Sequence, residues 1–546
     1  MVEHQLPKLR VAGSNPVYRS RKDKRTESNF GSFVFFSFSM KQLLTLILVL
    51  LIWGCAPKQT EVATFQNPVI FADVPDVDIV RVGADYYMVS TTMHLSPGAP
   101  VMHSKDLVHW ETVSYLFDRL DESPKNDLEG GHIYGRGQWA SSIRYHEGLY
   151  YVLFGTGNRT YIYTTRDPHG KWEKRCELEE YLHDASLLFD EGHIYIAYGA
   201  GEIRIVELEE DFSALKKDGV NALVINREPA GLLEGTHLYK LGDTYYMMVI
   251  WWPKGGIRTQ LCFRSKQIEG PYEMQVVLSD DLGFERHGVA QGCLIDTEAG
   301  DWYAMLFQDH EAVGRVPVLM PCRWVDGWPM LGDAEGKVPH TMPIPVQGVE
   351  PKGAMVVSDS FDSPTLGLTW QWNHNPDNAL WSLGERPGFM RLKTGKVVES
   401  IFEARNTLSQ RTEGPRCRAA VKLDISAMQA GDRAGLSLYC SEPGTLTVSR
   451  ETTGTTLSMT DRGAVIETVP LECEELWLAA ECDFTTDTAR FSYSLDGEAW
   501  QPLGKDFHMI YNLVHFMGNR FAIFNYATVA PGGWVDVDEF CYERID

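Results

Sequence analysis

A run of alternating apolar and polar residues, a glycine-containing turn and an aromatic-rich strand recur five times between residues 66 and 345. The copies read IVRVGADYYMVST, IRYHEGLYYVLFG, LLFDEGHIYIAYG, LYKLGDTYYMMVI and LIDTEAGDWYAML, with turn glycines at Gly83, Gly148, Gly192, Gly242 and Gly300. Each copy predicts a β-hairpin, because a Gly, Asp or Glu turn between two strands lets the chain reverse. No apolar stripe with the period of a helix persists in this region, so a helical fold is not expected.

A second segment follows three of these hairpins. SKDLVHWE (104–111), TRDPHGKWE (165–173) and SKQIEGPYE (265–273) each end on an aromatic residue and a glutamate. Each unit therefore holds an inner pair and an outer pair of strands. Five four-stranded units in succession predict a five-bladed β-propeller over residues 66–345.

The pattern changes after the fifth unit. HTMPIPVQGVEPKGAM (340–355) is punctuated by Pro and Gly and reads as a linker. Short alternating strands separated by turns then predict a concanavalin-like β-sandwich over residues 356–546, so the fold class expected is all-β. Trp370, Trp372 and Trp381 could offer that sandwich a sugar-binding surface, but a purely structural role is the favoured interpretation.

The first 55 residues are set apart from the fold. Residues 1–39 read as an upstream extension, and LLTLILVLLIW (43–53) is too short to span a bilayer but suits a signal peptide. The run ends IWGC, which puts Cys55 where a bacterial lipoprotein is cut and lipidated, with residues 56–65 as a tether. We expect an exported protein held to the membrane only by this lipid, on the periplasmic side rather than the cell surface. A plain signal peptide is the alternative.

Composition narrows the partners. The formal charge of −24 over 546 residues argues against nucleic acid, whose phosphates would be repelled. An aromatic content of 11% beside excess carboxylates suits a neutral oligo- or polysaccharide, whose sugars offer apolar faces and many hydroxyls. The nine cysteines after Cys55 form no CxxC pair and no zinc-type cluster, so most are expected to be buried thiols. One or two disulfides are the alternative in an exported protein, and the sequence does not pair them. The oligomeric state stays open.

Carboxylates recur at the entry to the inner strands, which line the channel of a propeller. Counting back from each turn places a carboxylate in blades one, three and four, at Asp76, Asp184 and Glu234. Charges that face one another across a narrow channel are costly unless they are paired or functional. Two carboxylates at one site are what glycoside hydrolysis requires, one as acid and one as base or nucleophile, and a third can favour the protonated acid through like-charge repulsion.

Two neighbours of Asp76 receive other roles. Asp73 is expected to be a structural aspartate at a turn or strand start, and Asp78 a hydrogen-bonding neighbour of the site. A calcium loop over Asp76 to Asp78 is not supported, because Val80 and Arg81 stand where a further acid and a glycine would be needed.

The order of motifs resembles glycoside hydrolase family 43, which contains β-xylosidases, α-L-arabinofuranosidases and arabinanases. The resemblance rests on NPVIFADVPDVDIVRVGADYYMVSTT, PGAPVMHSKDLVHW, QWASSIRYHEGLYYV, HDASLLFDEG, EGTHLYKLGDTYYM, SKQIEGPYE and GRVPVLMPCRWVDGWPML, between about residues 66 and 335. It implies that Asp76 is the general base, Asp184 the aspartate that tunes the acid, and Glu234 the general acid. It also implies inversion, with the base and acid roughly 6.5–9.5 Å apart.

The same resemblance implies a set of substrate-binding residues. Arg315 in VGRV would anchor sugar hydroxyls, Trp139 would wall the pocket, and Met93 and His94 would line the sugar subsites. Gln291 takes the place of a histidine that helps to hold a central ion or water in many members, and we place it at the substrate too. This substitution argues against a structural calcium ion, which stays an open alternative, and no cofactor is expected to be required.

The expected function is release of terminal α-L-arabinofuranose, or of β-D-xylose, from hemicellulose or pectin fragments by an exo-acting inverting hydrolase. A β-xylosidase as the main activity and a non-catalytic sugar-binding propeller are the alternatives. A five-bladed fructan hydrolase is disfavoured, because no NDPNG-type motif is present.

Overall fold

The computed structural model describes residues 62–284 and 287–545. Cys55, the signal segment and most of the predicted tether lie outside the described residues. In the part that is described, none of the helices has the length and apolarity needed to traverse a bilayer. Strands dominate, and within residues 62–284 and 287–545 the helical elements are three short 3-10 turns, η1 (Pro124–Asp127), η2 (Glu311–Val313) and η3 (Ile401–Glu403).

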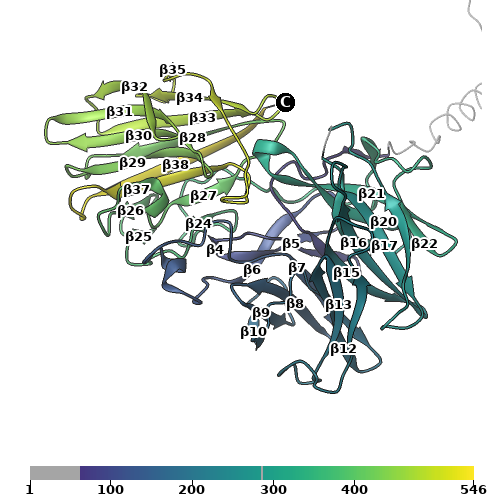
Figure 1. The fold of residues 1–546 in the computed structure, drawn as a ribbon. Helices are drawn as coiled ribbons and strands as arrows, with labels where there is room; N and C mark the ends of the chain where they lie inside the picture. The colour runs from purple at the N-terminus through teal and green to yellow at the C-terminus, as the bar shows by residue number, and fades with distance from the viewer. Residues whose placement is uncertain (1–61, 285–286, 546) are drawn as a thin grey trace, which may run out of the picture. The chain divides into compact units, whose positions relative to one another are not determined.

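Five antiparallel sheets of four strands follow one another along the chain (Figure 1). Blades one and two comprise β2 (Asp78–Val82), β3 (Asp85–Val89), β5 (Gly98–Ser104), β6 (Glu111–Phe117), β7 (Ser141–His146), β8 (Leu149–Thr156), β9 (Arg159–Thr165) and β10 (Glu173–Leu178). Blades three and four comprise β11 (Ser186–Asp190), β12 (His193–Ala200), β13 (Glu202–Leu208), β14 (Asn221–Asn226), β15 (Leu232–Leu241), β16 (Thr244–Trp252), β17 (Thr259–Ser265) and β18 (Glu273–Leu278). Blade five comprises β19 (Ala290–Asp296), β20 (Trp302–Asp309), β21 (Arg315–Val325) and β22 (Trp328–Leu331).

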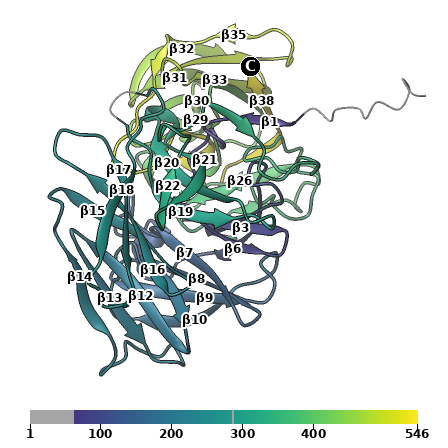
Figure 2. The ribbon, with the colours of Figure 1, turned by 90° about the vertical axis from the view of Figure 1, so that its right-hand side faces the viewer.

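The five-bladed propeller is therefore confirmed, and its hairpins reverse where the pattern predicts. The turn glycines have positive φ, as at Gly83 (63°) and Gly242 (62°), a conformation that costs little without a Cβ. Inner strands contact one another in the order β2, β7, β11, β15, β19 and back to β2, which closes the ring. Figure 2 shows the blades from a second side.

Neighbouring blades are joined by a repeated hydrogen bond at the channel. A short polar side chain two residues after the strand entry accepts the backbone N–H of the next blade. The pairs are Ile143 N to Asp78 Oδ2 (2.9 Å), Leu187 N to Ser142 Oγ (3.2 Å) and Leu238 N to Ser186 Oγ (2.9 Å). The short polar residues of the repeat thus satisfy buried backbone donors that a propeller leaves between its blades.

The C-terminal domain is a sandwich of two antiparallel sheets, as predicted. One sheet contains β32 (Ala464–Leu471), β31 (Gly454–Asp461), β30 (Gly444–Glu451), β29 (Asp432–Tyr439), β37 (Arg520–Ala527), β27 (Leu408–Arg411), β24 (Gln371–Asn373) and β4 (Leu95–Ser96). The other contains β25 (Trp381–Ser382), β26 (Met390–Lys393), β38 (Trp534–Ile545), β28 (Arg416–Asp424), β33 (Glu475–Asp483), β34 (Thr488–Ser494) and β35 (Gln501–Pro502), with β36 (Phe507–His508) pairing β34.

Two short pairings tie distant parts of the chain together. β1 (Thr64–Gln66) pairs with β23 (Thr341–Pro343), which brings the two ends of the propeller segment side by side. β4 lies within blade one but pairs with β24 of the sandwich, so one sandwich sheet extends into the propeller. This shared sheet joins the sandwich to blade one.

The burial of side chains tests two predictions from the sequence, one on the tryptophans of the sandwich and one on the cysteines. Trp370 and Trp372 are 1% and 3% exposed and pack in the core, so neither can form a sugar platform on the surface. The nine described cysteines are all free thiols, seven of them buried and two partly buried.

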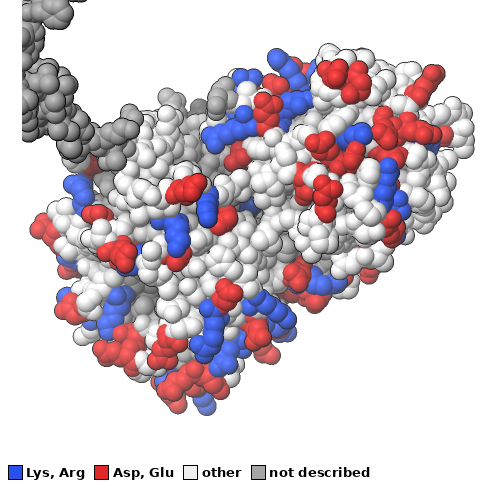
Figure 3. Space-filling model, turned by 180° about the vertical axis from the view of Figure 1, so that it is seen from behind, with Lys and Arg blue, Asp and Glu red and all other residues white. Residues whose placement is uncertain are grey.

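On the face shown in Figure 3, lysine and arginine lie among aspartate and glutamate instead of gathering into one basic surface.

Candidate active site

The inner strands begin with unusual backbone geometry, and the pairing of the inner strands of blades four and five is bulged. Asp76 (φ 54°), Asp184 (φ 45°) and Gln291 (φ 67°) adopt left-handed backbone conformations that are strained for residues with a Cβ. In blade four Gly235 (φ 65°) holds this place, and β15 is irregular between Glu234 and His237. Glu234 therefore lies one residue before the position it was predicted to share with Asp76 and Asp184.

Asp76 is a buried carboxylate with two side-chain partners. Its Oδ1 and Oδ2 lie 3.0 and 3.1 Å from Arg315 Nη1, and Thr91 Oγ1 donates to Oδ2 at 2.6 Å. Both members of the Asp76–Arg315 pair are at most 5% exposed. A charge-assisted hydrogen bond of this kind is short and strong, and it fixes the orientation of the carboxyl group.

Glu234 lies beside a histidine. His183 Nε2 is 3.1 Å from Glu234 Oε2 and 3.7 Å from Asp184 Oδ1, while His183 Nδ1 is 3.1 Å from the hydroxyl of Tyr181. Burial would lower the pKa of His183, but the hydrogen bond to Glu234 and the charges of Asp184, Glu234 and Asp76 raise it to about 9. The neighbouring carboxyl groups therefore favour the protonated imidazole of His183.

Asp184 is the most enclosed of these groups after Asp76. Burial raises its pKa to about 7; the charge of His183 opposes this rise and those of Glu234 and Asp76 add to it. Gln291 Nε2 lies 3.4 Å from Asp184 Oδ2. The three predicted carboxylates thus act on one another at a single place, although they come from three blades.

The guanidinium of Arg315 has N–H donors that Asp76 does not use. Its Nε and Nη2 atoms are buried and have no hydrogen-bond partner within the described residues. Phe516, from the sandwich, packs on its guanidinium at 4.4 Å and meets Trp139 edge-on at 5.7 Å. Two unmet donors beside an aromatic wall match a ligand with hydroxyl groups.

Asp73 and Asp78 have the structural roles expected of them. Asp73 accepts the backbone N–H groups of Arg315 (2.8 Å) and Gly518 (3.0 Å), so it holds the arginine and the sandwich loop in place. Asp78 accepts from Arg144 at 2.6 Å and contacts His237 at 3.1 Å. Burial would raise the pKa of Asp78, but Arg144 and His237 hold it well below its ordinary value.

Met93 and His94 lie deeper than a sugar-lining role would suggest. Both are 1% exposed, and Met93 pairs through its backbone with Gln138. The ring of His94 packs against Tyr134 and two rings of the sandwich, His374 (4.9 Å) and His515 (5.6 Å). In this structure His94 belongs to the junction between the two domains.

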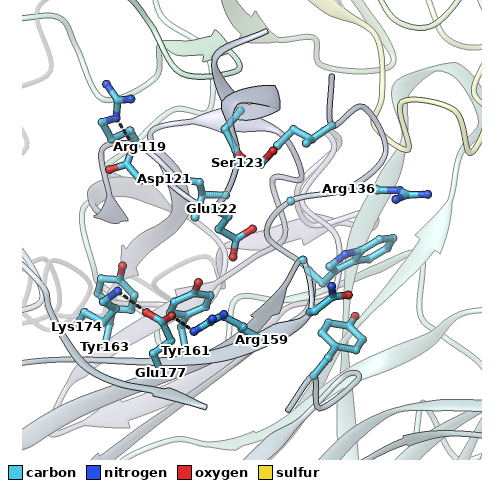
Figure 4. Close-up of a pocket in the computed structure, with 18 of the residues that line it drawn as sticks. Arg119, Asp121, Glu122, Ser123, Arg136, Arg159, Tyr161, Tyr163, Lys174 and Glu177 are labelled. Carbon is cyan, nitrogen blue, oxygen red and sulfur yellow. Dashed lines mark hydrogen bonds and ion pairs between the residues drawn. The ribbon is translucent and has the colours of Figure 1, made fainter. Parts of the chain in front are cut away.

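A cavity of about 950 Å³ lies beside His183, the residue that contacts Glu234. Trp139, Tyr181 and His183 line one part of it. Figure 4 shows further lining residues, among them Arg159 and Lys174, which both pair with Glu177. Its wall also includes residues 119–123, Arg136, Tyr161 and Tyr163, so the cavity combines aromatic rings with charged groups and is large enough for several sugar units. The three predicted carboxylates and Arg315 are not among the described residues that line it.

Comparison with known proteins identifies the family to which the chain belongs. Residues 65–329 match the model of the glycosyl hydrolases family 43, and residues 358–543 match the β-xylosidase C-terminal concanavalin A-like domain. The chain is 31% identical to a β-xylosidase of Formosa agariphila, over 88% of this chain and 90% of that one. It belongs to glycoside hydrolase family 43.

Other relatives of this family 43 enzyme carry different names. A non-reducing end α-L-arabinofuranosidase of Bacteroides ovatus is 29% identical over 84% of this chain and 90% of its own length. The structure of a bifunctional GH43-CE protein of Bacteroides eggerthii superposes with a TM-score of 0.83 at 43% identity, over 89% of this chain and 64% of that one. The chain is thus a glycosidase of a family whose members act on more than one sugar.

Sequence reasoning missed three residues of this family 43 site. His183 stood next to Asp184 in the HDAS motif, and that adjacency was an available signal. Tyr181 orients His183 from two residues away and carried no motif of its own. Phe516 comes from the sandwich, where no repeat or motif pointed to the propeller.

The only group of three metal-type donors found among the described residues is part of this same site. Ligand atoms of His183, Asp184 and Glu234 lie within 4.8 Å of one another. The two carboxyl groups and the imidazole already contact one another through His183. Catalytic acid and base groups that influence one another's protonation also lie this close together, so the short distances do not by themselves indicate a metal ion.

Proposed function

We propose that this family 43 enzyme is an exo-acting inverting hydrolase that releases terminal α-L-arabinofuranose from hemicellulose or pectin fragments. The observation that carries the proposal is the convergence of Asp76, Asp184 and Glu234, from three blades, beside the unmet donors of Arg315. Acid, base and sugar-binding donors are then present together, as inverting hydrolysis requires.

In the proposed mechanism Asp76 acts as the general base. Its contacts with Arg315 and Thr91 hold it in one orientation, so that it can take a proton from the water that attacks the anomeric carbon. Glu234 donates a proton to the leaving oxygen from the opposite side. The buried Asp184 is the third carboxylate of the site, and it orients Glu234 through their shared neighbour His183.

The free nitrogens of Arg315 are proposed to bind hydroxyls of the terminal sugar, with Trp139 and Phe516 as aromatic walls. A wall supplied by the sandwich favours exo action, because it closes one side of the site. We propose that the cavity next to His183 receives the leaving group.

The second candidate is release of β-D-xylose as the main activity. The name of the Formosa agariphila relative and the description of the C-terminal family model both favour it. Rates on 4-nitrophenyl α-L-arabinofuranoside and 4-nitrophenyl β-D-xyloside decide between the two sugars. Absence of turnover on either, with sugar binding retained, would instead support a non-catalytic sugar-binding protein.

The assignment of acid and base has its own test. Glu234→Gln and Asp76→Asn should each lower kcat by at least about 100-fold, since acid–base catalysis contributes roughly that much or more. Proton NMR of the first-formed anomer should show inversion. Net retention would remove Asp76 as a general base, because a retaining enzyme uses that carboxylate as a nucleophile.

We also propose that the enzyme is exported and lipid-anchored through Cys55, without a required cofactor. The support is the apolar run that ends at this cysteine and the neutral polysaccharide substrate, which occurs outside the cell. Incorporation of a radiolabelled fatty acid by the full chain, abolished in Cys55→Ser, would support this. A protein that partitions into the soluble fraction without label would contradict it.

A further inference from the structure

His183 stands between the general acid and a tyrosine that fixes its ring. Its Nε2 lies 3.1 Å from Glu234 Oε2, and its Nδ1 lies 3.1 Å from the Tyr181 hydroxyl. The imidazole is 30% exposed and lines the 950 Å³ cavity, so it faces the side from which a leaving group would approach Glu234.

The hydrogen-bond chemistry gives this contact a direction. A carboxylate oxygen can only accept from a ring nitrogen, so an ionised Glu234 requires Nε2 to carry the proton. In the neutral imidazole Tyr181 would donate its O–H to Nδ1, which selects the same Nε2–H tautomer; in the imidazolium both nitrogens donate. In each case Oε2 accepts a hydrogen bond from His183.

We propose that His183, oriented by Tyr181, is a positioning residue that binds Oε2 of Glu234 and leaves Oε1 to carry the acid proton to the leaving oxygen. The inference rests on the proposed role of Glu234 as general acid. The proton moves from Oε1 to the glycosidic oxygen as the bond to the anomeric carbon breaks, and His183 keeps its own proton throughout.

Other charged groups lie near His183 and influence the pKa of its ring. Asp184 Oδ1 lies 3.7 Å from Nε2, and the charge of Asp76, which is paired with Arg315, also acts on the ring. Together these carboxyl groups raise the pKa of His183 and so favour a ring in which Nε2 carries a proton.

The test uses leaving groups of different acidity. A sugar alcohol must be protonated as it leaves, whereas 2,4-dinitrophenolate leaves without help. His183→Phe should therefore lower kcat/KM on an oligosaccharide by on the order of 10- to 100-fold and on the 2,4-dinitrophenyl glycoside of the same sugar by less than about threefold.

Two further variants separate positioning from packing. His183→Gln keeps an N–H donor for Oε2 without charge, so it should recover most of the oligosaccharide activity. Tyr181→Phe removes one hydroxyl and should reproduce the leaving-group dependence in weaker form. His193→Gln is the matched control, since His193 makes a similar contact with Glu207 (2.8 Å) on the same blade, away from the site.

The outcomes are distinguishable. Equal losses on both substrates in His183→Phe and Tyr181→Phe, or no loss on either, would overturn the inference. Glu234→Ala serves as the reference for a missing acid: if it shows no dependence on the leaving group, the proposed acid itself is wrong. If Glu234→Ala shows that dependence and the His183 variants do not, only the role of His183 fails.

Discussion

Arg315 Nη1 lies 3.0 Å from one carboxylate oxygen of Asp76 and 3.1 Å from the other. The two residues are 239 positions apart in the chain, on the last blade and the first, and both are buried. The arginine thereby holds the proposed base with one nitrogen, while its Nε and Nη2 have no hydrogen-bond partner among the described residues.

Replacing this arginine should therefore affect both functions. Arg315→Lys loses the planar guanidinium that serves Asp76 and the sugar together, and kcat/KM should fall by on the order of 100-fold. Steady-state kinetics with a melting curve would check this. Arg81→Lys is the control, because Arg81 makes a two-point pair with Asp296 between the same two blades outside the site. Equal losses in both variants would contradict a specific role for Arg315.

The raised pKa of Asp184 predicts a pH-dependent stability. The ordinary value is 3.8 and the folded value is about 7, so the folded state holds a proton that the unfolded state has lost between these pH values. Stability of the wild type should therefore fall as the pH rises from about 4 to 7 on this account. Asp184→Asn escapes that penalty, and its Tm relative to wild type should be higher at pH 8 than at pH 5.

A carboxylate with the opposite shift provides the comparison. Burial would raise the pKa of Glu207, but Lys216, His193 and the Val220 N–H lower it to about 2. Its contribution to stability is present above the ordinary value of 4.5 and is lost as the pH falls toward 2. Glu207→Gln should thus be destabilised at pH 7 and approach wild type near pH 2, and the same trend in both variants would contradict the assignment.

The channel contains a cation that belongs to the chain. Arg144 donates to Asp78 (2.6 Å), to Ser186 Oγ (2.9 Å) and to Leu238 O (3.3 Å), so it ties blades one to four together. Removing it in Arg144→Met leaves Asp78 buried with one charged partner fewer, at a cost of about 3–5 kcal/mol. Urea unfolding would measure this loss. Activity per folded molecule at low temperature should change little.

Metal removal is expected to leave the enzyme intact. Arg144 already supplies positive charge to the channel carboxylate, and by the family resemblance Gln291 stands where many members have a histidine that helps to hold an ion. Dialysis against EDTA should therefore change neither Tm nor kcat/KM by more than the error of measurement. A loss of activity that added calcium restores would show that a structural ion is present after all.

The sandwich should contribute to substrate binding through a single loop. Phe516→Ala removes the ring that packs on Arg315 and faces Trp139, and we expect KM to rise by on the order of tenfold. Leu513 lies in the same loop and is 71% exposed, so Leu513→Ala provides the control. If both variants bind substrate as the wild type does, the sandwich has no direct part in the site.

Strands and turns were predictable because they depend on neighbours in the chain. Alternating residues and the turn at Gly83 report local geometry, and five copies of the same pattern leave few arrangements other than a propeller. The repeat also led to Asp76 and Asp184. It placed Glu234 one residue out of register, because the irregularity in β15 depends on its pairing with β16 and cannot be seen in the residues of β15 alone.

The sequence by itself determined the blades, the sandwich and which carboxylates stand at the strand entries. Only the tertiary structure decided what those carboxylates touch: His183 reaches Glu234 across 51 residues, and Phe516 reaches Arg315 from another domain. It also moved His94 from the expected sugar subsite to the domain junction. The physical reason is that backbone periodicity is local, whereas a buried charge is set by whichever side chains the closed ring of blades brings to it.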